Sequence, residues 1–360
     1  MRESADFALL GHQESWDQVS RIVHTLRAPD KPPLPAESVR EIMPWIPART
    51  IARMVMRSVP DERTVRGVYI ESFITPDELG PGTLRQAIGK VRDAIRCAVR
   101  EGAKVAALGG FTSIVIEGQE ELHGGIALTT GNTLTAAFIV KGLERAAFCS
   151  GVPLADATLV IAGATGDIGT ACARYFSGRT RRLVLSARRA DRLARLAAEL
   201  RVTGAGAEVL VIGEALPMAD LVISVASLAG AEWDLADCQP GAIVCDAGYP
   251  KNLRPSPPVG NPVQVFHGGM GRIQGGWVSD SAVLDTFYTM PAPFIAHGCM
   301  LEGIVLAMEE RYEPYSRGRG HITPARIEEV WQMAARHGVG LAPLYNHDGL
   351  WVDGDREPVR

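Results

Sequence analysis

Residues 157–169 read ATLVIAGATGDIG, an apolar, partly β-branched run that ends in a glycine-spaced turn. A pair of phosphates needs backbone N–H donors at close range, and residues without a Cβ allow that approach at the positive end of a helix. The spacing is GxxGxxG and not the commoner GxGxxG, so an ordinary glycine turn of an unrelated α/β protein is the alternative. The predicted cofactor residues of this turn are Gly163, Ala164, Thr165, Gly166, Asp167, Ile168 and Gly169.

The chain after this turn alternates strands and helices, as a doubly wound parallel sheet requires. We predict strands at 157–162, 182–187, 207–212, 220–225, 241–246 and 263–266, with helices at 168–177, 191–200 and 214–219. The second strand ends in LVLSARR, so positive charge stands where NAD-specific folds place an acidic residue. Ser186, Arg188 and Arg189 therefore favour NADPH, although a solvated basic helix start would look the same. Ala226, which follows the strand at 220–225, completes the predicted cofactor set.

The first half of the chain also predicts α/β structure. Strands are expected at 6–11, 65–74, 104–108 and 126–130, and helices at 14–26, 84–100 and 133–148. The segment up to Arg57 looks helical, with Ile42, Ile46, Ile51, Met54 and Val55 on one face. Two helices, at 292–312 and 324–337, and a weakly ordered tail at 341–360 follow. The predicted fold class is α/β: an N-terminal α/β domain (1–150), a Rossmann-like doubly wound parallel sheet (151–290) and C-terminal helices (291–360).

Composition excludes several kinds of protein. A net charge of −4 and a pI near 6.1 give no basic excess, so nucleic acid is not an expected partner. The six cysteines include no CxxC pair, which argues against a zinc ribbon or a disulfide framework and for a reducing compartment. The N-terminus lacks a secretory h-region, and the apolar run 291–308 contains His297 and Glu302, so a buried helix is expected and not a membrane span. We expect a cytoplasmic protein without a metal site.

Cys299 lies in the segment PAPFIAHGCMLEGIVLAMEE. Pro291 and Pro293 suit a helix start, which would place Cys299 near the first turns, where the helix dipole lowers the pKa of a thiol. A cysteine in an apolar helix is more often inert core, and the other five cysteines keep that interpretation.

Eight segments carry a resemblance to a known family, in the order LLGHQES, VYIESFITP, ALGGFTSIVIEG, LTTGNTLTAAFIV, VIAGATGDIGTA, EALPMADLVISVAS, CDAGYPKN and the Cys299 segment. From about Phe7 to Gly338 the chain resembles the cyanobacterial long-chain acyl-[acyl-carrier-protein] reductases. The resemblance implies NADPH-dependent reduction of a fatty acyl thioester to an aldehyde, with Cys299 acylated by the acyl carrier protein thioester. It also implies an aldehyde-deformylating oxygenase as the enzyme that takes the product.

Such chemistry needs a stabilised oxyanion and a proton donor. Ser113, Thr129, Asn132 and Lys251 are candidates for these roles, with Glu71 and Tyr249 as proton or orientation groups. Each has an equally good structural explanation, such as a helix cap or a paired carboxylate. His12 and His297 are the notable histidines; His297 is two residues from Cys299 and is expected only to pack, unless the helix begins after it.

Other oxidoreductases fit less well. A short-chain dehydrogenase would need a YxxxK pair, but Tyr249 and Lys251 are only two residues apart. A glutamyl-tRNA reductase would have its nucleophile in the N-terminal domain and a surface for tRNA. Two alternatives stay open: a shikimate-dehydrogenase-like enzyme acting on a small polar substrate, and a non-catalytic NADP-binding sensor.

Overall fold

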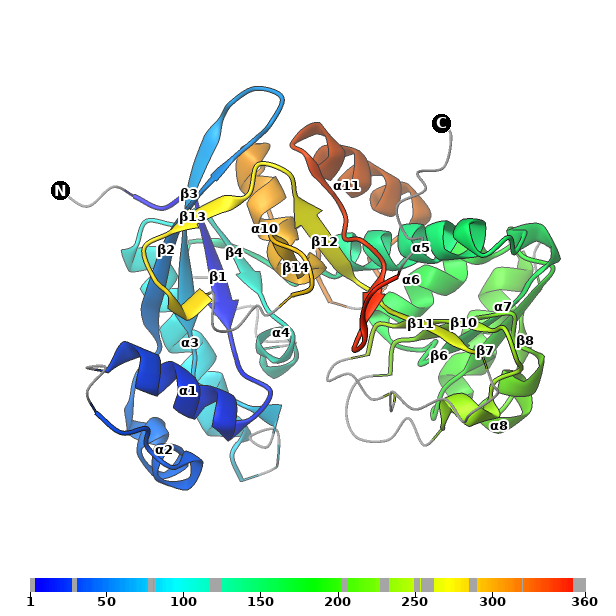
Figure 1. Ribbon diagram of the computed structural model, residues 1–360, viewed down its shortest axis with the longest axis horizontal. Coiled ribbons are helices and arrows are strands. Elements are labelled where there is room, and N and C mark those ends of the chain that lie inside the picture. The colour runs from blue at the N-terminus through cyan, green and yellow to red at the C-terminus, as the bar shows by residue number, and fades with distance from the viewer. Residues whose placement is uncertain are drawn as a thin grey trace. The chain divides into compact units, whose positions relative to one another are not determined.

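The chain forms two compact units in a computed structural model (Figure 1), which describes residues 4–27, 31–76, 80, 82–116, 125–202, 206–226, 233–248, 253, 262–284, 290–318 and 320–351. The first unit comprises Met1–Gly131, Ile273–Gly318 and Gln332–Gly340, and the second comprises Asn132–Arg272, Arg319–Trp331 and Leu341–Arg360. This division differs from the boundaries expected at 150 and 290. Helix α5 (Asn132–Cys149) belongs to the second unit, and α10 (Gly298–Met308), which carries Cys299, belongs to the first.

The first unit is built on a six-stranded sheet of order β13-β2-β3-β1-β4-β5. Its four strands β3, β1, β4 and β5 run parallel, while β2 and β13 pair antiparallel at one edge. The bounds are β1 (Phe7–Gly11), β2 (Arg49–Arg57), β3 (Thr64–Glu71), β4 (Val105–Leu108), β5 (Ala127–Thr129) and β13 (Trp277–Ser279). Because parallel strands share one carboxyl edge, the loops after β1, β4 and β5 meet there.

Two helices cover the faces of this sheet. Alternate residues of β1, Ala8 and Leu10, join a buried cluster with Val91 and Ile95 of α3 (Leu84–Arg100). The other face packs against α10, which is buried along almost its whole length. A Cβ added to Gly303 of α10 would lie 2.8 Å from the Ala107 Cβ, so this glycine lets the helix approach β4 closely.

The second unit is the Rossmann-like sheet that the sequence predicts, with order β11-β10-β9-β6-β7-β8 and all strands parallel. Helices α5, α6 and α7 lie on one side of it and α8 on the other (Figure 1). The strand order reverses between β6 and β9, the switch point at which such sheets bind ligands. The bounds are β6 (Thr158–Ala162), β7 (Arg182–Ser186), β8 (Glu208–Val209), β9 (Leu221–Ser224), β10 (Ile243–Asp246), β11 (Gln264–His267), α6 (Asp167–Phe176), α7 (Ala190–Val202) and α8 (Ile212–Ala215).

The remaining elements are short. They are α1 (Trp16–Leu26), α2 (Ala36–Ile42), α4 (Phe111–Val115), α11 (Pro324–Arg336), the 3₁₀ turns η1 (Met43–Trp45), η4 (Leu154–Asp156), η5 (Leu216–Met218) and η6 (Leu235–Asp237), and the strands β12 (Met270–Ile273), β14 (Ile295–His297), β15 (Val339–Leu341), β16 (Tyr345–Asn346) and β17 (Gly349–Leu350). Within the described ranges, no helix has the length and apolarity needed to cross a membrane.

The helix predicted up to Arg57 is wrong beyond η1, because residues 49–57 form β2. Met54 and Met56 are buried while Val55 and Arg57 are exposed, the period of two that a half-buried strand shows. The register shifts between Thr50 and Ala52, so Ile51 and Ala52 are both buried. This irregularity breaks the alternation and produces the apparent helical spacing.

Two predictions for the C-terminal part are also wrong. The helix expected from 292 begins only at Gly298, because Phe294 has a left-handed backbone (φ 61°) and residues 295–297 form β14. The expected weakly ordered tail is structured up to residue 351: Tyr345 is buried, and the Trp351 indole N–H donates to the Val265 carbonyl oxygen at 3.0 Å. Residues 352–360 lie outside the described ranges.

Candidate active site

Cys299 is the second residue of α10, at the end of the helix that approaches the carboxyl edge of the first sheet. The loop after β4 contributes Gly109 and Gly110, and the loop after β5 contributes Gly131. A Cβ on Gly131, whose φ is 69°, would lie 2.2 Å from the Cys299 Cα atom. A Cβ on Gly109 would lie 3.5 Å from the Met300 Cε atom. The glycine of the TTGN string therefore lets its loop pack directly against the start of the cysteine's helix, and the GGFTS loop lies within van der Waals distance of Met300.

Cys299 is partly exposed as a residue, but its thiol is desolvated and accepts hydrogen bonds from backbone N–H groups. Desolvation raises the pKa of the thiol above its ordinary value, and the hydrogen bonds from the amides of Gly110, Met300 and Cys299 itself oppose that shift. The charge of Glu302 raises the pKa further. The expected lowering of this pKa is thus wrong for the free protein, because desolvation outweighs the helix-terminal amides.

His12 and His297 lie near this site. The Phe111 amide N–H donates to His12 Nε2 at 3.1 Å, so that nitrogen carries no proton. Burial lowers the pKa of His12 to about 4, which keeps its ring neutral, and the charge of His297 contributes to the shift. His297 ends β14 and has an extended backbone directly before α10. The helix therefore begins after His297. The packing role expected of His297 applies to a residue inside the helix, and this condition is not met.

Two other candidates from the sequence, Ser113 and Glu71, have hydrogen-bond partners within the protein. Ser113 Oγ donates to the Gly110 carbonyl oxygen at 2.7 Å, within the loop that contacts the cysteine's helix. Glu71, at the end of β3, is fully buried; its oxygens accept from Gln13 Nε2 at 2.7 Å and from the Phe73 amide at 2.8 Å. Burial raises the pKa of Glu71 to about 7. Lys251 and Tyr249 lie outside the described residues.

A buried polar cluster that the sequence analysis did not assign lies one helical turn after Cys299. The Glu302 carboxylate, 0% exposed, accepts hydrogen bonds from the hydroxyls of Thr129 and Ser316, the latter at 2.9 Å. The Ser316 amide donates to Thr129 Oγ1 at 3.1 Å. The signal in the sequence was a single carboxylate inside the otherwise apolar run CMLEGIVLAM, since such a residue is seldom fully buried without partners.

A second constellation superficially resembles a hydrolase triad. Ser58 Oγ and His337 Nδ1 are 3.0 Å apart, and His337 Nε2 lies 2.9 Å from Glu309 Oε1. Ser58 is 0% exposed, so no substrate reaches its hydroxyl. Because the nearby Arg63 donates to the Met308 carbonyl oxygen at 2.8 Å, this group fastens the turn after β2 to the end of α10.

In the second unit, the glycines of the turn after β6 fit a dinucleotide. Gly163 has φ 87°, and a Cβ there would lie 2.8 Å from the Ala226 amide nitrogen; a Cβ on Gly169 would lie 2.3 Å from the Gly163 carbonyl oxygen. Both glycines are thus required by the protein's own packing. A Cβ on Gly166 would meet only the Gly163 oxygen, at 3.4 Å. The glycine at 166 leaves open space before α6, the cradle that a phosphate group would fill.

Several groups of this turn already have partners. The amides of Gly163 and Ala164 donate to the Ser186 carbonyl oxygen at 2.8 and 3.1 Å, so they are not available to a phosphate, whereas Ile168 and Gly169 lie in the first turn of α6, where amides have no intrahelical acceptor. The Asp167 carboxylate accepts from Asn132 Nδ2 at 3.0 Å and from the Gly320 amide at 3.2 Å.

The two arginines after β7 differ. Arg189 forms a two-pronged ion pair with Asp191 at 2.9 and 3.0 Å, and the guanidinium lowers the pKa of that carboxyl to about 2. Arg188 is exposed, and it has no ion pair with any described residue. Of the two, Arg188 is the one available to a 2′-phosphate.

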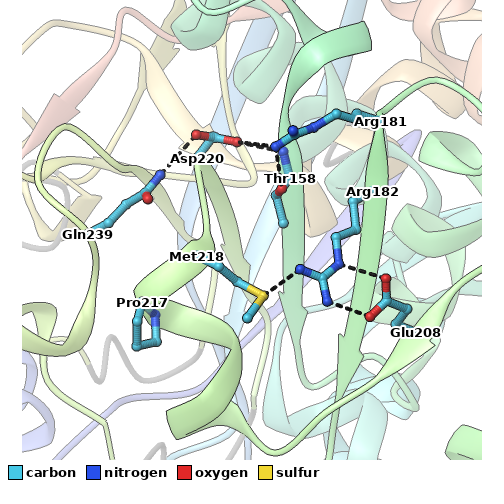
Figure 2. Close-up of a pocket in the computed structure, with 8 residues that line it drawn as sticks. All are labelled: Thr158, Arg181, Arg182, Glu208, Pro217, Met218, Asp220 and Gln239. Carbon is cyan, nitrogen blue, oxygen red and sulfur yellow. Dashed lines mark hydrogen bonds and ion pairs between the residues drawn. The ribbon is translucent and has the colours of Figure 1, made fainter.

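A hollow of about 550 Å³ lies at the opposite end of the same sheet (Figure 2). Its lining comes from the amino ends of strands, and its polar groups pair with one another. Arg182 binds Glu208 at 2.7 Å, and Gln239 donates to Asp220 at 2.9 Å. Ligands of such sheets bind at the carboxyl ends of the strands, so this hollow is not the cofactor site. No group of side chains among the described residues has the composition of a metal site.

The fold and the glycine turn define a class: α/β proteins with a Rossmann-like parallel sheet, which bind dinucleotides at the switch point of the sheet. No protein-family model matches the chain. It is 30% identical over 344 residues to the long-chain acyl-[acyl-carrier-protein] reductase of Synechococcus elongatus, covering 92% of this chain and 97% of that protein. The chain belongs to the family of long-chain acyl-[acyl-carrier-protein] reductases.

More distant matches add little. The aminotransferase PigE of a Serratia strain is 26% identical over 304 residues, which cover 81% of this chain and 34% of PigE. Among solved structures, the nucleotide-binding domain of glutamyl-tRNA reductase from Thermoplasma volcanium matches 36% of this chain and 84% of that chain, with 20% identity and a TM-score of 0.27. E. coli K-12 YhdH with bound NADPH matches 38% of this chain and 42% of that chain, with 20% identity and a TM-score of 0.30.

Proposed function

We propose that this protein reduces a long-chain fatty acyl thioester of acyl carrier protein to a fatty aldehyde, with NADPH as reductant and Cys299 as the acylated nucleophile. Family membership supports the substrate class. The observation that carries the role of Cys299 is its place at the start of α10, with the amides of Gly110 and Met300 directed at its sulfur. Backbone N–H groups in such a place stabilise developing negative charge.

Two steps follow from this assignment. In the first, the Cys299 sulfur bonds to the acyl carbon, the bond from that carbon to the carrier sulfur breaks, and the carrier thiol leaves with the cysteine's proton. His12 does not act as the base for this proton, because its Nε2 already accepts the Phe111 amide. In the second, NADPH would supply, when bound, the hydride that reduces the acyl carbon; the Cys299 C–S bond would break as the aldehyde forms, and NADP⁺ would remain to be released. The Cys299 thiolate regains a proton from water.

The second unit would hold the cofactor. The open space at Gly166 and the first-turn amides of α6 suit its pyrophosphate, and Arg188 suits its 2′-phosphate. Ser113, Lys251 and Glu71 remain proposed contributors to the chemistry. The aldehyde product is of the class that an aldehyde-deformylating oxygenase consumes.

Replacing the nucleophile tests this proposal against a non-catalytic NADP-binding sensor. Cys299→Ala should abolish aldehyde formation and leave NADPH binding, measured by fluorescence titration, unchanged. Cys149→Ala is the matched control, because Cys149 is also a partly exposed cysteine in a helix. Full aldehyde formation by Cys299→Ala would exclude the covalent route.

A further inference from the structure

We propose that Glu302 is the positioning residue of the nucleophile: its buried carboxylate holds the first turns of α10 against the loop that packs on Cys299, and its negative charge opposes formation of the thiolate. This inference rests on the proposed role of Cys299. The geometry that carries it is the cluster of Glu302, Thr129 and Ser316, which are 0%, 0% and 2% exposed.

The hydrogen bonds of the cluster have a fixed direction. Thr129 Oγ1 accepts the Ser316 amide at 3.1 Å, so its own proton is directed to Glu302 Oε1. The Ser316 hydroxyl donates to the other oxygen, Oε2, at 2.9 Å. Both carboxylate oxygens therefore accept hydrogen bonds, each from its own hydroxyl donor.

The cluster joins three segments that surround Cys299. Glu302 lies three residues after Cys299, and residues at that spacing share one face of a helix. Thr129 ends β5 and is two residues before Gly131, whose backbone touches the Cys299 backbone. The Thr130 amide also donates to the Ser316 carbonyl oxygen at 3.1 Å. Glu302 thus fastens the first turns of α10 to the loop that packs on the nucleophile.

Other titratable groups stand on the elements packed against α10. They are His12 after β1, Glu71 at the end of β3 and His297 in β14. Burial keeps His12 neutral at physiological pH and favours the protonated form of Glu71. Desolvation raises the pKa of Cys299, and the Glu302 charge raises it further, so the thiol stays protonated in the free enzyme. Protonation makes a thiol less reactive toward oxidants than the thiolate is.

The test is the pH dependence of Cys299 alkylation by iodoacetamide, followed by peptide mass spectrometry that resolves this cysteine from the other five. Glu302→Gln keeps the shape and removes the charge, so the pH midpoint of alkylation should shift to lower pH, and the alkylation rate at pH 7 should rise. Glu302→Asp retains the charge and should keep the midpoint close to that of the unmodified protein. A purely structural role would change the protein's stability but would leave the midpoint of Glu302→Gln where it was, and that result would overturn the inference.

If Glu302→Gln does not fold, Glu302→Met combined with Ser316→Ala removes the charge together with one of its donors, a replacement that buried cores tolerate better. The same fall in midpoint is expected, and an unchanged midpoint again contradicts the inference. Alkylation needs neither acyl carrier protein nor NADPH. Failure of the proposed reductase activity would appear instead as a missing acyl adduct in a protein whose alkylation midpoint still depends on Glu302.

Discussion

At the scale of single residues, the sequence and the structure give different information about the two arginines that follow β7. The string SARR indicates a preference for NADPH but does not distinguish Arg188 from Arg189. The structure separates them, because Arg189 is held by Asp191 while Arg188 has no ion pair with a described residue.

We therefore expect Arg188→Ala to raise the KM for NADPH by roughly tenfold or more, the effect of losing one charge-assisted hydrogen bond, and to leave the KM for NADH nearly unchanged. Arg189→Ala is the matched control and should change both values little. Steady-state kinetics with each cofactor measures the difference. Equal effects of the two substitutions on NADPH would contradict the assignment.

Residue-level reasoning from sequence predicted Cys299 and the glycine turn but missed Glu302 and Ser316. Cys299 and Gly163 belong to contiguous strings with a chemical reason for their spacing. The Glu302 cluster unites β5, α10 and the loop at 316, which are up to 187 residues apart in the chain. No local pattern predicts such a meeting, and only the packed structure shows it.

At the scale of elements, the approach of the TTGN turn to α10 is the contact on which the site depends. Gly131→Ala should lower the free energy of unfolding by about 3 kcal/mol and abolish activity, because the new Cβ meets the Cys299 backbone in addition to the strain of a positive φ. Gly151→Ala is the control: its φ is 71°, but a Cβ there meets nothing within 4 Å, so it should cost only about 1 kcal/mol. Urea denaturation of both variants measures the comparison, and equal losses would show that the close approach is unimportant.

Element prediction succeeded where the apolar period was regular and failed where it was interrupted. Helix α3 was predicted with its observed bounds, because its apolar stripe is unbroken over 17 residues. Strand β2 was missed because its register shift disguises the alternation. The predicted start of α10 is too early because the two prolines before it are followed by a strand and not by a helix. Phe294, which lies between Pro293 and β14, has a left-handed backbone conformation.

At the scale of the whole molecule, the chain passes between its two units several times, and no pattern in the sequence predicts these crossings. Helix α5 follows β5 directly yet packs with α6 and β10 of the Rossmann-like unit, while α10 returns to the first sheet. The boundaries expected at 150 and 290 follow the order of elements along the chain, which does not show the unit against which each helix packs. The fold class could be predicted because it depends only on the alternation of strands and helices.

Stability against pH is a second property of the whole molecule. The pKa of Glu71 is raised to about 7, so its contribution to stability is full below its unfolded value near 4.5 and is lost as the pH rises through 7. His12, lowered to about 4, has the opposite effect: its contribution is present above 6.5 and is lost as the pH falls to 4. Between about pH 4.5 and 6.5, a rise in pH therefore lowers the contribution of Glu71 to the free energy of unfolding and raises that of His12.

Glu71→Gln removes the contribution of Glu71 to the pH dependence of the free energy of unfolding. The free energy of unfolding of the variant minus that of the unmodified protein should therefore increase as the pH rises from 4.5 to 8, by at most about 3 kcal/mol. Urea denaturation at a series of pH values measures this, with Glu62→Gln, an exposed carboxylate, as the control. A difference that does not change with pH would show that Glu71 titrates normally.

The central claim, an acyl-cysteine at Cys299, is tested most directly by intact-mass spectrometry of the protein after incubation with a long-chain acyl thioester of acyl carrier protein. Without NADPH, the mass should increase by one acyl group, which peptide mapping places on Cys299 and which Cys299→Ala does not acquire. Adding NADPH should remove the adduct and release aldehyde. A protein that forms aldehyde with no adduct on Cys299 in either condition would contradict the account.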